Sequence, residues 1–160
     1  MRKLASALTI VTMAVLGILF LVWVGTGLKA GVTGADAQAA SSQQGAFDTI
    51  TGAILSGDMG SDQFKKVSEP DPARYQIVTY RVQVKNPGIL GADWVRLKLS
   101  PTDSDVALLA APQDVGPFGS QEVTAQLLTE AGSDVKRDVW IEYYILGSRQ
   151  SQAAHWSTND

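Results

Sequence analysis

The chain of 160 residues has no cysteine, a single histidine and three fewer basic than acidic residues. Without cysteine it can form no disulfide and no thiolate metal site, and it cannot carry the lipid of a lipoprotein anchor. The histidine, His155, lies near the end of the chain, where backbones usually fray, so we expect neither a zinc site nor a catalytic triad. We therefore expect no cofactor, and an exported domain without cysteine is typical of a prokaryote.

Charged residues are also absent from residues 4–28, which follow Arg2 and Lys3. A helix of this length extends about 37 Å, beyond the ~30 Å hydrocarbon core of a bilayer. Trp23, near its far end, suits the headgroup layer. We predict that residues 1–3 form a cytoplasmic tip and that 4–28 form a transmembrane helix, an uncleaved signal anchor in contact with the lipid bilayer.

Two alternatives to the anchor stay open. Small residues flank single positions at Ala35-Asp36-Ala37 and Ala37-Gln38-Ala39, a pattern that a signal peptidase accepts, and cleavage there would yield a secreted domain. The other alternative is a pilin-like surface subunit that polymerises through its apolar segment. That segment lacks the glutamate by which prepilins resemble one another.

The distribution of charge predicts the orientation in the membrane. Residues 30–54 contain neither lysine nor arginine, so the positive-inside rule places the N-terminus in the cytoplasm and the rest of the chain outside. Beyond Lys29 the chain has 10 basic and 16 acidic residues, a net charge of −6. This charge disfavours nucleic acid as a partner. Residues 29–45, rich in Gly, Ala, Ser and Gln, predict a flexible linker.

Residues 46–160 show the two-residue alternation of half-buried strands. Val82 and Val84 share one face of such a strand, for example, while Arg81 and Gln83 share the other. Clusters of Pro, Gly, Asn, Asp and Ser separate the alternating segments. We predict an all-β domain, an antiparallel immunoglobulin-like (Ig-like) β-sandwich. The expected strands lie within Phe47–Leu55, Tyr75–Lys85, Asp93–Leu99, Val106–Ala110, Glu122–Leu128 and Val139–Ile145.

Three stretches of the chain, Tyr80–Gly88, Ala92–Leu99 and Phe118–Leu127, resemble the Ig-like and fibronectin-III-like sandwiches of prokaryotic surface proteins. The likeness is to adhesion-related and late-embryogenesis-like modules, and it covers about Tyr80–Leu128. The chain lacks the paired cysteines of antibody-type domains. The resemblance implies a role in adhesion, assembly or scaffolding, and it brings no catalytic residues.

Two groups of side chains are candidates for binding. Asp103 and Asp105 offer carboxylate oxygens for a calcium ion in a loop, although aspartate is also an ordinary turn residue. Large side chains that point away from the predicted inward faces, or that lie in a loop, could form an interaction surface; the alternative is that they fill cross-strand pairs or cap the core. These residues are Trp94, Ile89, Leu90, Trp140 and Tyr144.

Together these patterns predict a membrane-anchored extracytoplasmic domain with a non-catalytic interaction, adhesion or structural role in the cell envelope. Its expected partner is another envelope or surface protein. An unrecognised hydrolase, or an accessory to an envelope hydrolase, is the alternative from a different functional class.

Overall fold

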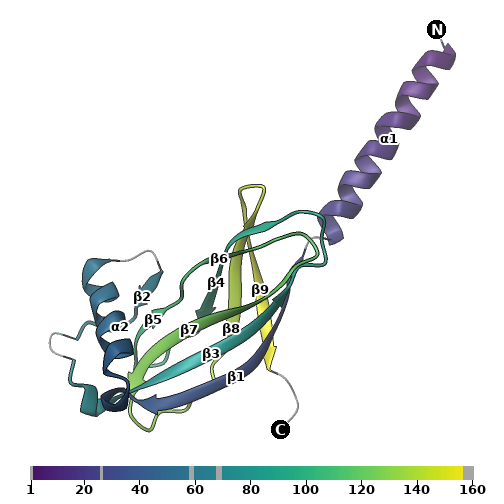
Figure 1. Cartoon of the computed structure of the whole chain (residues 1–160). Helices are drawn as coiled ribbons and strands as arrows, with labels where there is room; N and C mark the ends of the chain where they lie inside the picture. Colours follow the sequence, from purple (N-terminus) through teal and green to yellow (C-terminus); the bar gives the residue numbers. More distant parts are fainter. Residues whose placement is uncertain (1, 26, 58–59, 68–69, 157–160) are drawn as a thin grey trace.

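The computed structural model describes residues 2–25, 27–57, 60–67 and 70–156. A long helix stands away from a body of β-strands, with a second helix at the far side of that body (Figure 1). The elements in chain order are α1 (Arg2–Gly25), β1 (Lys29–Ala39), η1 (Ala40–Ser42), α2 (Gln44–Ser56), β2 (Ser61–Gln63), η2 (Pro72–Arg74), β3 (Tyr75–Lys85), β4 (Ala92–Leu99), β5 (Asp105–Leu109), β6 (Gln113–Val115), β7 (Ser120–Glu130), β8 (Val139–Ile145) and β9 (Ser148–Trp156).

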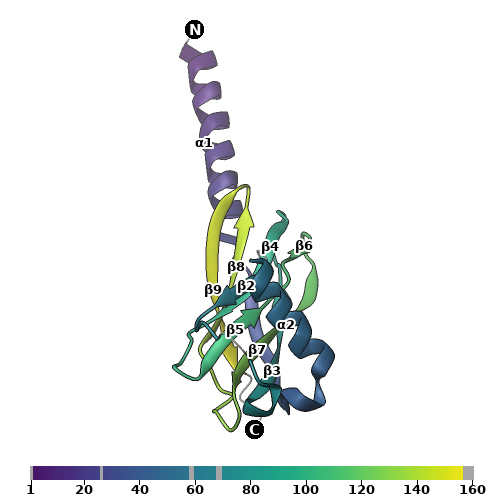
Figure 2. The same ribbon diagram turned by 90° about the vertical axis from the view of Figure 1, so that its left-hand side faces the viewer.

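In the described residues the strands form one nine-stranded sheet in the order β2-β5-β7-β3-β1-β9-β8-β4-β6. Strands β1 and β9 are parallel and align Ala30 with Ala154, whereas the other neighbours are antiparallel. At this junction the sheet folds over, so that β2-β5-β7-β3-β1 form one layer and β9-β8-β4-β6 form the other (Figures 1 and 2). The predicted β-sandwich is confirmed at this level.

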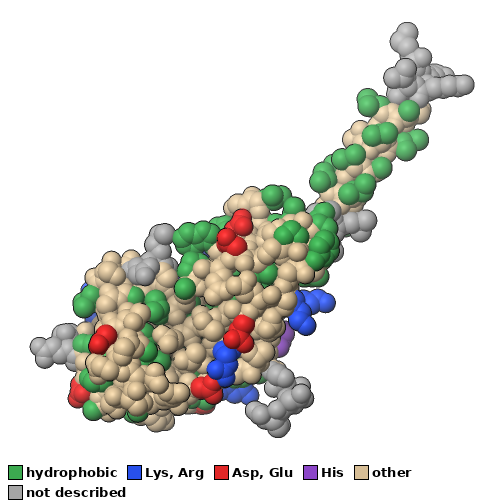
Figure 3. All heavy atoms as spheres, in the orientation of Figure 1, with side chains coloured by type: hydrophobic (Ala, Val, Ile, Leu, Met, Phe, Trp, Pro, Cys, Tyr) green, Lys and Arg blue, Asp and Glu red, His purple; other side chains and the backbone are tan. Residues whose placement is uncertain are grey.

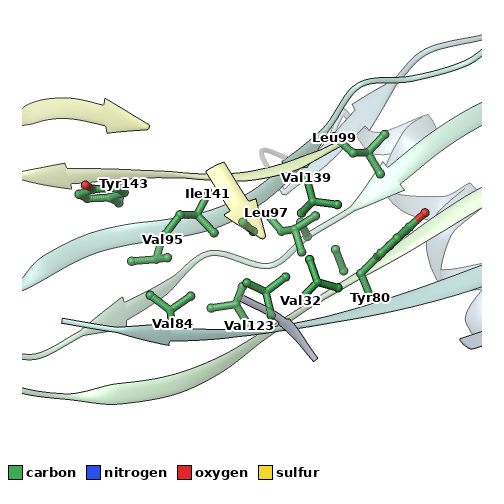
Figure 4. Close-up of a cluster of buried hydrophobic side chains, with 14 of the residues drawn as sticks. Val32, Tyr80, Val84, Val95, Leu97, Leu99, Val123, Val139, Ile141 and Tyr143 are labelled. Carbon is green, nitrogen blue, oxygen red and sulfur yellow. The ribbon is translucent and has the colours of Figure 1, made fainter. Parts of the chain in front are cut away.

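The main core lies between the two layers (Figure 4). Tyr80, Val84 and Val123 project into it from β3 and β7, while Val95 and Leu97 meet them from β4, and all five side chains are fully buried. Alternate residues of β3 and β4 are thus inward, as the two-residue pattern predicted. Burial of these apolar side chains is the main stabilising contribution to the fold.

The predicted strand within Phe47–Leu55 is wrong, because this segment lies in helix α2. Phe47, Ile50 and Ile54 are spaced three and four residues apart, so on a helix they share one face. That face packs in a second apolar cluster with residues of β5 and β7. Gly57 ends the helix with a φ of 66°, the left-handed conformation that glycine adopts readily.

The predicted flexible linker over residues 29–45 is also wrong. Its first eleven residues are strand β1, which pairs with β3 from Lys29 opposite Lys85 to Ala39 opposite Gln76. Its start pairs with β9 on the other side, and the remaining residues include η1 and the first residues of α2. A strand with neighbours on both sides satisfies its backbone groups through the ladders, which outweighs the weak strand preference of Gly and Ala.

The end of the described chain is ordered by pairing, contrary to the expected fraying. His155 is exposed, but its backbone lies opposite Gly31 within β9. The ring of Trp156 packs edge-on against that of Tyr80, with centroids 6.4 Å apart, and its indole N–H donates to the Arg137 carbonyl at 3.0 Å. Strands β2 and β6 were also not predicted, because three residues are too few to establish an alternation of apolar and polar side chains.

Helix α1 has described side chains from residue 6 to residue 20, and all of them are exposed. Within the described part of the chain, no helix reaches the combined length and hydropathy of a membrane crossing. The predicted span over 4–28 is wrong at its end, because α1 ends at Gly25 and Leu28 is buried in the core of the sandwich. The side chains of residues 1–5, which include the predicted cytoplasmic tip at 1–3, and of residues 21–26 lie outside the described residues.

Tyr80→Phe should lower the free energy of unfolding by about 1 kcal/mol, the net value of a typical buried hydrogen bond. The Tyr80 hydroxyl donates to the Val135 carbonyl at 2.7 Å, and burial raises the pKa of Tyr80 to about 12. Because the folded protein favours the neutral hydroxyl, this stabilisation is present below pH 10 and is lost as the pH rises towards 12. Urea unfolding of both proteins at pH 7 and pH 11 measures the difference. An equal loss of stability with pH in the two proteins would contradict this role.

Candidate functional site at the helix end of the sandwich

The strand register brings several connections to one end of the sandwich. Lys29, Lys85 and Ser120 are aligned across β1, β3 and β7, so β1 begins where β3 ends and β7 begins. The β3–β4 loop, residues 86–91, and the β6–β7 loop, residues 116–119, therefore lie at this end. Helix α1 joins the body there too, and we call it the helix end (Figure 1).

The β8–β9 hairpin also reaches the helix end. The backbone N–H of Leu28, just before β1, donates to the Tyr143 hydroxyl of β8 at 3.3 Å. Strand β8 runs towards α1, and the hairpin turns at Leu146 and Gly147, three and four residues further on. Figure 2 shows the hairpin rising beside the base of α1.

The buried side chain of Asn86 joins the β3–β4 and β6–β7 loops. Its amide nitrogen donates to the carbonyls of Leu90, Gly116 and Val115, at 2.7, 3.1 and 3.3 Å. Its amide oxygen accepts the Gly88 N–H at 3.0 Å. The two loops are thus held as one unit, because a single side chain satisfies backbone groups from both.

Large exposed apolar and aromatic side chains gather at the helix end. We call this set the apical rim, and it consists of Ile89, Trp94, Phe118, Tyr144 and Leu146. Phe118 is 72% exposed and Leu146 is 83% exposed. Among the described residues outside α1, one other large apolar side chain is exposed, that of Leu55 on α2. Figure 3 shows hydrophobic side chains gathered where α1 leaves the body. Such a concentration of exposed apolar side chains at one end makes the apical rim a candidate contact surface.

Backbone strain coincides with the apical rim. Trp94, Phe118 and Leu146 have φ angles of 54°, 53° and 50°, and they are the described non-glycine residues with positive φ. This conformation costs roughly 1–2 kcal/mol for such side chains. In the two-residue turn of Leu146 and Gly147, asparagine is the ordinary first residue. Smaller or polar residues at these positions would therefore give a more stable fold.

Trp94 lies at a β-bulge in β4. The pairing of β4 with both β6 and β8 shifts register around this residue. Its backbone N–H donates to Oδ1 of Asp114 at 2.8 Å, and Pro112 and Gln113 line a shallow depression beside its ring. The bulge thus turns a large aromatic side chain out of the sheet towards solvent.

The structure gathers most, but not all, of the predicted interaction residues. Ile89, Leu90, Trp94 and Tyr144 lie at the helix end, where Leu90 is half-buried in its loop. Trp140 lies four residues before Tyr144 on β8, opposite Lys98, so it is nearer the other end of the strand. It is half-buried and is not part of the apical rim.

Sequence reasoning missed two members of the apical rim, Phe118 and Leu146. Phe118 stands between Pro117 and Gly119, and Leu146 precedes Gly147. Their neighbours had marked both segments as turns. The usable signal was a single large apolar residue where turns normally place a polar one.

The predicted calcium ligands have different surroundings. Asp103 is exposed, whereas Asp105 is buried and accepts from Arg137 through both oxygens, with Nη2–Oδ1 and Nε–Oδ2 distances of 3.0 Å. Burial alone would raise the pKa of Asp105, but hydrogen bonds from Arg137 and Thr102 outweigh it and lower that pKa. The arginine takes the Asp105 oxygens that a cation would need, which disfavours Asp105 as a calcium candidate. Over the described residues, no three His, Asp or Glu side chains form a group able to hold a metal.

A second ionic cluster joins the layers on the side away from the β1–β9 junction. Asp62 of β2 lies 3.2 Å from the nearest Arg96 nitrogen and 2.7 Å from Lys98 Nζ, both residues of β4. All three side chains are partly shielded from water. This cluster links the two layers by ion pairs. Its three charged side chains interact with one another, so no bound ligand is needed to explain their positions.

Comparison with known proteins finds similarity among solved structures. No protein-family model matches the chain, and no curated protein matches it. Among solved structures, an uncharacterized β-sandwich protein from Clostridium difficile 630 matches with 6% identity and a TM-score of 0.30. The match covers 79% of this chain and 84% of that chain.

Proposed function

We propose that the protein is a single-pass membrane protein that holds its β-sandwich outside the cytoplasmic membrane. In this proposal α1 is the anchor and the N-terminus is cytoplasmic. The sandwich has a non-catalytic interaction, adhesion or structural role in the cell envelope. The finer Ig-like or fibronectin-III-like assignment, with its resemblance to prokaryotic surface modules, belongs to the same proposal.

The observation that carries the proposal is the apolar surface of α1 on every side. Its exposed large side chains include Leu8, Ile10, Leu16 and Ile18, which point in four different directions around the helix. A helix that is apolar all round is stable only when protein or lipid surrounds it. The body packs around none of these described side chains, so a bilayer is the surrounding that we propose.

The place of β1 in the sheet supports retention of the anchor. Cleavage after Ala37 or Ala39 would remove most of a strand that pairs with β3 on one side and β9 on the other. The two layers would then lose their junction. A secreted product cut at these positions would lack the strand that joins the layers, so we favour the uncleaved form.

The surroundings of the buried polar groups support a non-catalytic role. Asp105 and Arg137 are bonded to each other, and Asn86 is bonded to loop carbonyls. Catalytic groups need access to a substrate. The exposed apical rim instead suits contact with another apolar surface.

Expression of the full chain in a bacterial host should yield a product of uncleaved mass that remains with the membrane fraction. Protease added to spheroplasts should digest the sandwich from outside, while protection should persist in intact cells. Intact-mass analysis and membrane fractionation give the readout. A shortened, freely soluble product that begins near Gln38 or Ala40 would contradict the anchor and indicate a secreted domain.

A further inference from the structure

We propose that the apical rim inserts into the headgroup layer of the same membrane that holds α1, so that the sandwich is seated on the bilayer. This inference rests on the proposed function, because it requires α1 to be in the membrane. The molecule that we propose to contact this surface is lipid, and the residues that contact the lipid are the five members of the apical rim.

The short connection between α1 and β1 keeps the helix end close to the membrane. Gly25 ends α1 and Lys29 begins β1, so four Cα–Cα steps separate them, a reach of at most about 14 Å. Leu28 is buried and bonded to Tyr143, which fixes the last part of this connection to the body. The helix end therefore stays near the level at which α1 leaves the bilayer.

The β8–β9 hairpin extends back towards the membrane from that point. Leu146 lies three residues beyond Tyr143 in the direction of α1, a distance of about 10 Å along a strand. The hydrogen bond between Leu28 and Tyr143 sets the starting level for this extension. The hairpin tip thus reaches the level of the last turn of α1, where the interface of the membrane would lie.

The residue types of the apical rim suit a bilayer interface. Trp94 and Tyr144 are the aromatic types that gather at the headgroup level, and Phe118 and Leu146 supply exposed apolar tips. Leu146 and Phe118 combine positive φ with high exposure, which the fold does not require. A lipid contact supplies the missing reason for large apolar side chains at these positions.

The charges at the helix end are mixed. Lys29 and Lys85 are exposed at the ends of β1 and β3, within reach of lipid phosphates, while Asp93 and Asp114 flank Trp94. This mixture favours a contact driven by apolar insertion over attraction to anionic lipid. Uncharged phosphatidylcholine vesicles are therefore an adequate probe.

The test uses single-cysteine labels, because the natural chain has no cysteine to remove. Full-length Leu146→Cys, Phe118→Cys, Leu55→Cys and Leu16→Cys proteins are labelled with bimane and placed in phosphatidylcholine vesicles that contain acyl-brominated lipid. Leu55 is 88% exposed on α2, away from the helix end, and is the matched control. We expect lipid bromine to quench the labels at positions 16, 118 and 146 and to leave the label at 55 unquenched.

The outcomes separate this inference from the proposed function. Quenching at 16 without quenching at 118 and 146 overturns the seated sandwich and leaves the anchor intact. Labels at 118 and 146 that are shielded from aqueous quencher but untouched by brominated lipid show a protein covering, which also overturns it. Absence of quenching at 16 as well overturns both proposals.

A double variant tests the apical rim without endangering the fold. Phe118→Asn with Leu146→Asn places a residue that tolerates positive φ at both positions, so thermal stability should be kept or raised. With bimane at Ile89→Cys as reporter, we expect the double variant to lose lipid quenching, whereas Leu55→Asn should retain it. Unchanged quenching in the double variant would overturn the proposal.

Discussion

Arg137→Ala should lower the free energy of unfolding by about 3–5 kcal/mol, because it leaves Asp105 as a buried charge without its partner. The two side chains are 5% and 0% exposed. All five N–H groups of the guanidinium have acceptors, which are both oxygens of Asp105, the carbonyls of Asp134 and Lys136, and the Thr102 hydroxyl. The substitution therefore breaks the link between β5 and the segment before β8, and urea denaturation measures the loss.

The matched control is Lys136→Ala, which removes an exposed neighbouring charge and should change stability by less than about 0.5 kcal/mol. Arg137→Lys should also be strongly destabilised, since an ammonium group cannot reproduce the planar fork. A loss below 1 kcal/mol in Arg137→Ala, on the same scale as a surface change, would contradict the assigned role of this ion pair.

The same ion pair predicts how stability depends on acid. The pKa of Asp105 is lowered in the folded protein, although burial alone would raise it, because hydrogen bonds from Arg137 and Thr102 favour the carboxylate. A lowered folded pKa means that this stabilisation is present above the ordinary aspartate pKa and is lost as the pH falls below it. We expect Asp105→Asn to be less stable than the natural chain at pH 7, with a difference that narrows below pH 4. A difference that stays constant with pH would exclude Asp105 as its source.

Asn86→Asp should have the second large effect, a loss of about 3 kcal/mol or more at pH 7. The natural amide nitrogen faces three carbonyl oxygens, those of Leu90, Gly116 and Val115. A carboxylate oxygen in that place donates nothing and repels all three. The β3–β4 and β6–β7 loops should separate, and thermal unfolding followed by circular dichroism measures the loss.

The pH dependence of the Asn86→Asp variant should have the opposite sign to that of the natural Asp105. Burial next to carbonyls would raise the pKa of the new carboxyl, and the protonated form can donate one hydrogen bond. Its stability should therefore recover as the pH falls towards 4 and decline as the pH rises through the raised pKa. Gln150→Glu makes the same amide-to-carboxylate change at an exposed site of β9, so it should be nearly neutral. A variant as stable as this control would contradict the proposed role of Asn86.

The elements found from the sequence are those whose own side chains carry the burial pattern. Strands β3, β4, β7 and β8 alternate between the core and the outer face, and the expected segments lie on them. Strand β1 carries no such pattern because, apart from Val32, its side chains are small or polar. Its conformation comes from β3 and β9, which are distant in sequence, so only the assembled sheet explains it.

The candidate site was predictable in the same partial way. Trp94 and Tyr144 were found because they lie on the outward faces of the predicted strands, and Ile89 because it stands in a loop, and the structure places all three at one end. The ion pair of Asp105, one of the two calcium candidates, was not predicted because its partner, Arg137, lies 32 residues away and nothing local indicates the pair. Phe118 and Leu146 were missed because their neighbours indicate turns. Their exposure depends on the backbone geometry of two loops.

Strand β1 has a further consequence for the proposed anchored protein. Its eleven residues run from the junction with α1 to the start of η1, a length of roughly 36 Å at the rise of a β-strand. Because the sheet holds β1 along this length, it acts as a stiff post with α2 at its top. A molecule that binds near α2 would then be held at a fixed distance from the lipid surface. Insertion of residues before Lys29 would remove this constraint on the distance.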